Sequence, residues 1–487
     1  MASRDIVCGV DALTPQDATR YWLSRRTCND LFLLYCFTDT GVPSDVLCAG
    51  LAERARRIAD LSVRVRERRF AYPSWVPADF GAAPITEPAF AAPTWTNIVA
   101  ALGDLLTDGV DAARCPWRLH LFRGVLGAPG GDDPALVAVL QLSHALADGR
   151  RAASVARALF TEVGGTAESL PARADRTGEH DRDGLGIGVD RSDADCSAGG
   201  AADRMKDVAR EFASLSMFPV ASGRTVVRGI AAERARRKLA ELTERGEVPR
   251  PAADYPPTSL NRSPAPAAHV VRILVRDDLH VPGRTVTVTV LTAIGAALTR
   301  YLESCGESPA ALAAQVSMAR PDRNTHSRNN YRDVGVELYG TEPDPCRRAD
   351  RIAADLELRR IRAAHPLFAA RDRVTDALPA PVLRRDIATY PMDLVPDALS
   401  GHTVVSSVNR GPADLTLGGG RVRFTAGFPA LGTVMHLTHG VHGLGATVAV
   451  SIHADPAAVT AVDNYANLLD TALSEVVDAL RSQPTAP

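Results

Sequence analysis

The spacing of hydrophobic residues predicts alternating strands and helices in the first third of the chain. Residues 31–37 form an unbroken hydrophobic run with the length of a buried strand, and 116–126 and 135–143 are two further strand candidates. Hydrophobic residues at helical spacing occupy 44–59 and 150–160. This part of the chain is therefore predicted to form one compact α/β unit.

A second α/β pattern begins near residue 269 and runs to the end of the chain. Helical spacing predicts helices at 286–301, 343–364 and 456–480. Short hydrophobic or alternating runs, separated by turn residues, predict strands. These strand candidates are 269–275, 315–319, 403–409, 421–426, 434–439 and 445–453.

The two patterns are separated by a stretch of different composition. Residues 164–203 are rich in Gly, Asp, Arg and Ser, which is typical of a disordered linker. Two amphipathic helices are expected next, at 203–218 and 226–245, split at Pro219. Both helices could dock on the core or lie on a membrane or partner surface.

These patterns predict an α/β protein with three parts. Residues 1–163 form a first domain, residues 164–258 a variable linker, and residues 259–487 a second domain. The chain has 46% hydrophobic and 23% charged residues, which is ordinary for a globular protein. Its formal net charge of −2 argues against a nucleic-acid binder, which needs a basic surplus.

Lysine and cysteine usage excludes several kinds of chemistry. Lys206 and Lys238 are the only lysines among 55 basic residues, and both lie in the predicted linker. A P-loop or a Schiff-base lysine is therefore not expected. None of the eight cysteines forms a C-x-x-C pair, so zinc ribbons are not expected and free thiols in a reducing compartment are.

The chain shows no apolar leader at its N-terminus, and its longest apolar run, 135–142, is far shorter than the roughly 20 residues that span a bilayer. We therefore expect a cytoplasmic protein. Peripheral contact with a membrane or a lipid droplet stays open.

The most specific candidate for chemistry is His144-x-x-x-Asp148-Gly149, directly after a buried strand. A neutral imidazole is a natural general base near pH 7. The glycine permits a tight backbone path, and the aspartate can hold the loop or fix the imidazole. The alternative is a histidine with a purely structural hydrogen bond.

A metal site is not expected. His436, His439 and His442 lie close together in the sequence, but the odd spacing of His439 from the other two places it on the opposite face of a strand. These histidines are interpreted as polar strand residues.

The strand, the H-x-x-x-D-G motif and the helix that follows together resemble the chloramphenicol acetyltransferase superfamily. Other motifs, in the same order along the chain, resemble one branch of it, the bacterial wax ester synthase/diacylglycerol acyltransferase (WS/DGAT) family. These are Leu13-Thr14-Pro15-Gln16-Asp17-Ala18, Arg114-Cys115-Pro116-Trp117, Ser259-Leu260-Asn261, Val316-Ser317-Met318-Ala319-Arg320-Pro321 with Asn329-Asn330, and Ser406-Ser407-Val408-Asn409-Arg410-Gly411-Pro412.

The resemblance implies two acetyltransferase-like domains around a central active-site tunnel. A fatty acyl-CoA would enter as substrate from one side, and an alcohol or a diacylglycerol-type hydroxyl from the other, to form a wax ester or a triacylglycerol. His144 would deprotonate the hydroxyl, Asp148 would hold the loop through an arginine, and Gly149 would complete the motif. No covalent acyl-enzyme and no cofactor are implied.

The resemblance also gives candidate tunnel residues. Asn330, Ser407 and Asn409 would be donors to the oxyanion, while Ser143 and Trp117 would shape the tunnel. The chain departs from the family at four motifs, which include Cys115-Pro116-Trp117 and Ser407-Val408-Asn409-Arg410. Ser143 stands where the family has a first histidine, and the family's N-D pair is absent at Thr287-Val288.

Two alternatives to an acyl-CoA transferase stay open. One is a condensation-type or polyketide-associated transferase, which takes its acyl group from a carrier-protein thioester. The other is a non-catalytic lipid-binding homologue, suggested by the lost histidine and the lost N-D pair.

Overall fold

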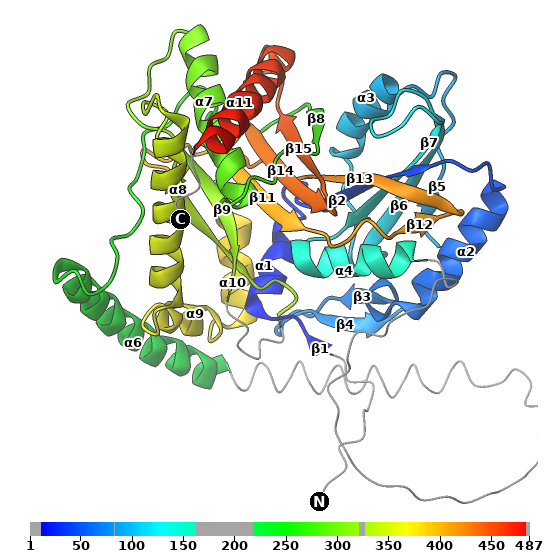
Figure 1. The fold of residues 1–487 in the computed structure, drawn as a ribbon. Helices are drawn as coiled ribbons and strands as arrows, with labels where there is room; N and C mark the ends of the chain where they lie inside the picture. Colours follow the sequence, from blue (N-terminus) through cyan, green and yellow to red (C-terminus); the bar gives the residue numbers. More distant parts are fainter. Residues whose placement is uncertain (1–10, 82, 162–217, 321–326, 484–487) are drawn as a thin grey trace, which may run out of the picture.

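The computed structural model describes residues 11–81, 83–161, 218–320 and 327–483. Two six-stranded sheets stand side by side, each with its own helices (Figure 1). The predicted linker 164–203 lies outside the described residues, and so does nearly all of the helix predicted at 203–218.

The first sheet has the strand order β12-β13-β2-β7-β6-β5. Alternate side chains of its central strand β2 enter two different cores, as a period of two requires. Leu33 packs beneath α1, α2 and α4, whereas Leu34 packs beneath α3 on the other face. The elements are β2 (Leu31–Thr38), β5 (Ile85–Thr86), β6 (Trp117–Val125), β7 (Ala135–Leu142), β12 (Thr416–Leu417), β13 (Gly420–Phe428), α1 (Pro15–Leu23), α2 (Ser44–Arg57), α3 (Trp95–Leu105) and α4 (Gly149–Phe160).

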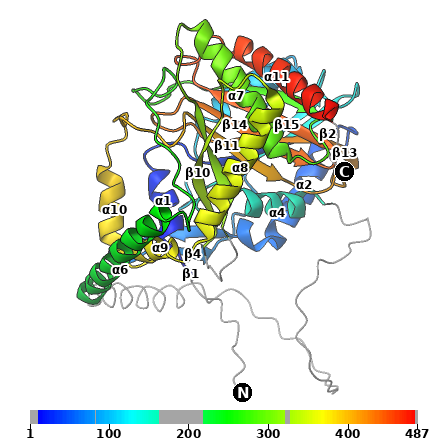
Figure 2. The ribbon, with the colours of Figure 1, turned by 60° about the vertical axis from the view of Figure 1, so that its left-hand side comes forward.

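The second sheet has the order β10-β9-β11-β14-β15-β8, and three helices cover it. In this unit α7 is buried along nearly its whole length, because α8, α11 and the sheet surround it (Figure 2). The elements are β8 (Val270–Arg276), β9 (Ala313–Ala319), β10 (Tyr331–Glu337), β11 (Thr403–Asn409), β14 (Leu437–Leu444), β15 (Thr447–Ala454), α7 (Val286–Ser304), α8 (Pro345–Ala364) and α11 (Val462–Ser482).

Further elements complete the fold. A three-stranded sheet with the order β1-β4-β3 belongs to the first domain, and the long helix α6 and two short helices flank the second. They are β1 (Asp11–Ala12), β3 (Val63–Arg66), β4 (Ser74–Pro77), the 3₁₀ helix Ala59–Leu61, α6 (Phe218–Glu244), α9 (Ala369–Thr375) and α10 (Ala380–Thr389).

The sheets do not follow the predicted boundary between the domains. Strand β13 belongs to the predicted second domain, 259–487, but it pairs antiparallel with β2 and extends the first sheet. The register places Phe424 opposite Cys36 and Phe428 opposite Phe32. The two domains are therefore joined by a strand exchange as well as by the linker.

The two sheets meet at a pair of glycines. A Cβ atom on Gly440 of β14 would lie 2.2 Å from the carbonyl oxygen of Gly427 on β13. Only glycine at position 440 allows this approach, since real Cβ atoms do not come so close to a carbonyl oxygen. The contact brings β13 of the first sheet against β14 of the second.

Helix α6 confirms the second of the two predicted helices, at 226–245. The described part of this helix runs from Phe218 to Glu244. The predicted split at Pro219 borders residues outside the described part of the chain. One face of α6 packs on the α9 region, where the Thr225 hydroxyl donates to the carbonyl of Ala377 at 2.7 Å (Figure 2).

No helix in the described part of the chain is both long and apolar enough to cross a bilayer.

Candidate active site

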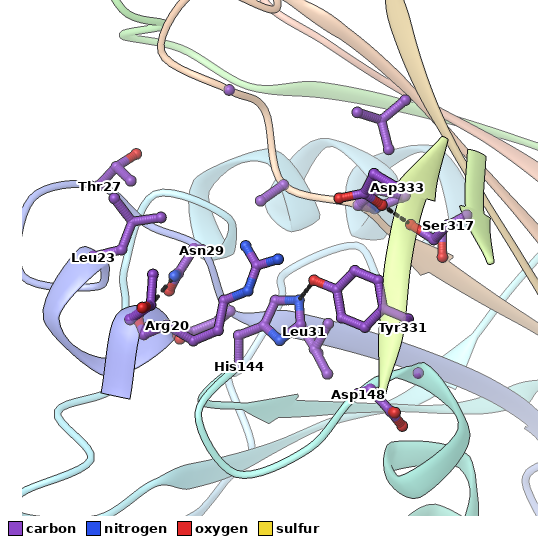
Figure 3. A pocket seen from close by; sticks show the side chains of 18 of the residues that line it. Arg20, Leu23, Thr27, Asn29, Leu31, His144, Asp148, Ser317, Tyr331 and Asp333 are labelled. Atoms are coloured by element: carbon purple, nitrogen blue, oxygen red, sulfur yellow. Dashed lines mark hydrogen bonds between the residues drawn. The ribbon is translucent and has the colours of Figure 1, made fainter. Parts of the chain in front are cut away.

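A cavity of about 650 Å³ lies between the two domains, within the usual size range of small-molecule sites. The first domain contributes α1, the start of β2 and the turn between β7 and α4. The second contributes β9, β10, β11, α10 and the loop 429–433. Its walls are mainly apolar, with a few polar groups around one histidine (Figure 3).

His144 lies in the turn after β7 and faces this cavity. Its Nε2 atom is 3.1 Å from the hydroxyl oxygen of Tyr331, which begins β10 of the other domain. The two rings are stacked, with centroids 5.8 Å apart. Its Nδ1 atom is buried and has no hydrogen-bond partner in the described parts of the chain. The reactive face of the imidazole is thus Nε2.

Burial, together with repulsion from the nearby Arg20 guanidinium, lowers the pKa of His144 to about 3. The imidazole is therefore neutral at pH 7. Burial also raises the pKa of Tyr331 to about 12, so its hydroxyl keeps its proton. We assign the imidazole proton to Nδ1, which leaves Nε2 as the acceptor of the Tyr331 hydroxyl.

Asp148 is the N-cap of α4, and both of its carboxylate oxygens are used. One accepts from the backbone N–H of Arg151 at 2.9 Å, which caps the helix. The other accepts from the backbone N–H of Asn330 at 2.9 Å, in the second domain. Asp148 therefore ties the His144 turn to the chain segment that carries Tyr331.

The sequence predicted that Asp148 would hold its loop through an arginine, and that expectation is wrong for the described residues. The guanidinium groups of Arg151 and Arg328 both pair with Asp60 instead, at 2.7 and 2.6 Å. Backbone amides take the place of the expected arginine at Asp148, because α4 begins there and leaves its first N–H groups without intrahelical partners.

Asp17 of α1 holds the same segment from the other side. This buried carboxylate accepts from the backbone N–H of Arg328 at 3.0 Å and from the Asn329 side-chain amide at 2.9 Å. The Asn329 amide also donates to the carbonyl of His144 at 2.8 Å. Two carboxylates of the first domain thus fix the segment that delivers Tyr331.

Gly149 has a role in packing. A Cβ atom at this position would lie 3.0 Å from Cγ2 of Val408 on β11. The glycine therefore lets the first turn of α4 approach the second domain closely, while the sequence analysis had explained it by a tight backbone path.

Two of the five other candidate residues line the cavity. Asn330 is one of them: its backbone N–H donates to Asp148, and its side-chain amide lies 3.5 Å from the carbonyl oxygen of Arg320. Ser407 also lines it, and its hydroxyl lies 2.8 Å from the hydroxyl of Thr287. Thr287, where the family's N-D pair was missing, therefore contacts a residue of the cavity wall.

Three candidates do not reach the cavity, which corrects the sequence prediction. Asn409 is exposed at the end of β11 and accepts from the N–H of Gly411 at 2.9 Å. Ser143 is buried behind the His144 turn. The Trp117 indole is buried in the core of the first domain, where its N–H donates to the carbonyl of Leu61 at 2.9 Å.

The sequence analysis missed Arg20 and Tyr331, and gave Asp17 no role. Asp17 belongs to a motif that the resemblance had used, so the sequence held a signal for it. Nothing local marks Arg20 or Tyr331. Their position depends on how α1 and β10 meet across the two domains.

The three histidines at 436, 439 and 442 have separate partners. His436 bonds Asp455 at 2.7 Å, His439 bonds the Tyr465 hydroxyl at 2.7 Å, and His442 is buried beside Gly427. The residues that the structure describes include no cluster of side chains suited to a metal ion.

The fold of this chain is that of a protein with two chloramphenicol acetyltransferase-like domains, as the sequence predicted. It is shared with the wax ester synthase/diacylglycerol acyltransferase from Marinobacter aquaeolei VT8, at a TM-score of 0.58 and 16% identity, over 96% of this chain and 99% of that one. No protein-family model matches this chain, and no curated protein sequence does.

Condensation domains of peptide synthetases share the fold as well. The first condensation domain of the calcium-dependent antibiotic synthetase, in complex with a substrate analogue, covers 98% of both chains at 14% identity and a TM-score of 0.54. A mutant starter condensation domain of rhizomide synthetase, in complex with C8-CoA, covers 98% of both at 12% identity and a TM-score of 0.53.

Proposed function

We propose that this chain is an O-acyltransferase that moves a fatty acyl group from acyl-CoA to a hydroxyl, with His144 as the general base. One observation carries the proposal. The Nε2 atom of a neutral imidazole faces the cavity between the domains and bonds a hydroxyl group there. A group in this position can take the proton of an acceptor hydroxyl.

The reaction follows from that position. Nε2 removes the proton from the acceptor hydroxyl as its oxygen attacks the thioester carbonyl. The tetrahedral intermediate then collapses, and the C–S bond breaks. The imidazolium returns the proton to the leaving sulfur, so the products are an ester and free CoA. No covalent acyl-enzyme forms.

The oxyanion of the intermediate needs hydrogen-bond donors inside the cavity. The side-chain amide of Asn330 and the hydroxyl of Ser407 are the candidates, because both line the cavity wall of the second domain. Asn409 is no longer a candidate, since it caps a turn outside the cavity.

The tyrosine hydroxyl on Nε2 marks the place of the acceptor. Tyr331 presents an O–H group to His144 as a substrate hydroxyl would. We propose that the acceptor displaces this hydroxyl when it binds, while Asp17 and Asp148 keep the segment in place.

A carrier-protein thioester is the second candidate for the donor, because condensation domains share the fold. Octanoyl-CoA and octanoyl carrier protein, offered to the same preparation with one alcohol, separate the two donors. Faster ester formation from octanoyl-CoA supports the proposal.

Replacement of His144 tests the mechanism. We expect His144→Ala to slow CoA release from octanoyl-CoA plus 1-decanol by about 10²- to 10⁴-fold, the usual contribution of a general base. His280→Ala is the control, because His280 is exposed and outside the cavity. Unchanged release in a folded His144→Ala variant would refute the role of His144. A wild-type protein that binds octanoyl-CoA and releases no CoA would favour the lipid-binding alternative.

A further inference from the structure

Arg20 of α1 places a positive charge inside the mainly apolar cavity. Its guanidinium lies beside the imidazole of His144 (Figure 3) and over the ring of Tyr331, with Cζ 5.4 Å from the ring centroid. Among the described residues Arg20 forms no ion pair. Its guanidinium lies against the Tyr331 side chain, and no carboxylate among the described residues pairs with it.

Four other arginines near the site form ion pairs with carboxylates of the chain. Arg151 and Arg328 share Asp60, while Arg320 and Arg332 share Asp372. An arginine that lacks a carboxylate inside a cavity is the usual means of binding a carboxylate or a phosphate. Two arginines that line the cavity, Arg20 and Arg150, form no ion pair among the described residues. Arg150 is exposed, whereas Arg20 is part-buried beside His144 and points to an anion supplied by a ligand.

The carboxylates that line the cavity are directed elsewhere. Asp148 accepts from two backbone amides, and Asp333 accepts from the hydroxyl of Ser317 at 2.7 Å. Asp30 accepts from the Gln141 side chain and from a backbone N–H, both at 2.8 Å. Asp386 lies exposed on α10. None of these four pairs with Arg20.

We propose that the hydroxyl acceptor carries a carboxylate, that Arg20 binds it, and that the substrate class is therefore a hydroxy fatty acid. This inference rests on the proposed function and names the acceptor for the same site. Arg20 and His144 both contact the ring of Tyr331, so the anion and the reacting hydroxyl are separated by only a few bonds. The acyl tail would lie on the apolar wall, which includes Leu23, Ile387 and Met392.

The electrostatics of the site favour such a substrate. The Arg20 charge lowers the pKa of His144, which weakens the imidazole as a base. A carboxylate bound to Arg20 neutralises that charge and makes the imidazole more basic. Binding of the substrate would thus raise the basicity of the imidazole that deprotonates the substrate's own hydroxyl.

A matched pair of acceptors tests the proposal. The probes are 3-hydroxydecanoate and its methyl ester, which differ in the charge and by one methyl group. In calorimetry without a donor, we expect the acid to bind the wild type and Arg20→Gln to weaken it by about 10- to 100-fold, as a charge-assisted contact implies. Arg20→Lys should restore part of the affinity. Arg25→Gln, which removes an arginine outside the cavity, should change nothing.

Three results would overturn the proposal. The first is equal binding of the acid by the wild type and by a folded Arg20→Gln variant. The second is equal or tighter binding of the ester by the wild type. The third is that the wild type binds neither probe.

A separate arm tests whether Arg20 serves the phosphates of CoA. If Arg20→Gln raises KM for octanoyl-CoA but not for octanoyl-N-acetylcysteamine, which has no phosphate, Arg20 binds the donor and the acceptor proposal is overturned. We expect equal KM changes for both donors. The binding assay needs no turnover, so an active His144→Ala variant would refute the mechanism and leave the carboxylate site standing.

Discussion

His144 presents one ring nitrogen to the cavity and the other to the protein interior. Nε2 meets a tyrosine hydroxyl that keeps its proton, whereas the buried Nδ1 has no partner in the described chain. A buried polar atom without a partner costs about 1–3 kcal/mol. The fold tolerates this cost at the one imidazole that the proposed chemistry needs in its neutral form.

The hydroxyl of Tyr331 supplies the first prediction. The acceptor must displace it from Nε2, and a neutral hydrogen bond is worth about 1 kcal/mol. We therefore expect Tyr331→Phe to raise kcat/KM for the acceptor about five-fold, chiefly through a lower KM. Steady-state kinetics with 1-decanol and octanoyl-CoA measure both parameters.

Tyr72→Phe is the control for that variant. Tyr72 donates to the carbonyl of Leu378 at 2.7 Å and does not line the cavity. A loss of more than ten-fold in kcat for Tyr331→Phe, with Tyr72→Phe unchanged, would mean that the Tyr331 hydroxyl takes part in proton transfer.

At the scale of elements, the contact between β13 and β14 joins the two domains. A methyl group on Gly440 would clash with the backbone of Gly427, and neither strand can move without opening a sheet. We expect Gly440→Ala to lower the free energy of unfolding by at least about 2 kcal/mol, within the range for overpacked cores. Urea denaturation measures it.

Gly443→Ala is a matched control on the same strand. A Cβ there would meet its nearest atom at 4.0 Å, which is ordinary contact. It should change stability by less than about 1 kcal/mol. Equal stability of the two variants would contradict the close approach of the two sheets.

The sequence predicted where helices and strands lie along the chain better than it predicted which of them pack against each other. The run at 421–426 indicated a strand, but nothing in it shows that β13 crosses to the first sheet. Trp117 was predicted to shape the tunnel, yet its indole is buried in the core of the first domain and bonds Leu61. Strand pairing and side-chain direction depend on contacts between distant segments, which a single sequence does not display.

The residues of the candidate site also fall into two groups, those that the sequence indicated and those that it did not. His144, Asp148 and Gly149 were found because they lie within six residues after a buried strand. Tyr331 and Arg20 come from other elements and reach His144 only through tertiary packing. A short local motif therefore indicated His144, while the residues that surround it could not be predicted from the sequence.

At the scale of the whole molecule, buried histidines couple stability to pH. Burial lowers the pKa of His144, His439 and His453 to about 3, and that of His442 well below its usual value. In the unfolded chain each one takes a proton below pH 6.5. Because the unfolded state binds more protons, stability is present above pH 6.5 and is lost as the pH falls towards 3.

Each histidine that is protonated in the unfolded chain and neutral in the folded one lowers the free energy of unfolding by about 1.4 kcal/mol for each pH unit below pH 6.5. Asp30 has the opposite effect on stability. Burial raises its pKa to about 6, so below that pH the folded state binds one proton at Asp30 that the unfolded state does not yet bind. We expect the urea midpoint to fall steeply between pH 7 and pH 5.5, and His453→Gln to make the fall shallower. Equal midpoints at both values would contradict the neutral, buried state of these histidines.

The central claim is that acyl transfer occurs directly between two substrates at His144. The most direct measurement follows ester, free CoA and protein mass together by mass spectrometry after octanoyl-CoA and 1-decanol are mixed with the protein. We predict equal amounts of ester and CoA from the wild type, unmodified protein throughout, and formation of both products about 10²- to 10⁴-fold more slowly by His144→Ala. An octanoylated protein that disappears as ester forms, or ester formation at the wild-type rate by His144→Ala, would contradict the account.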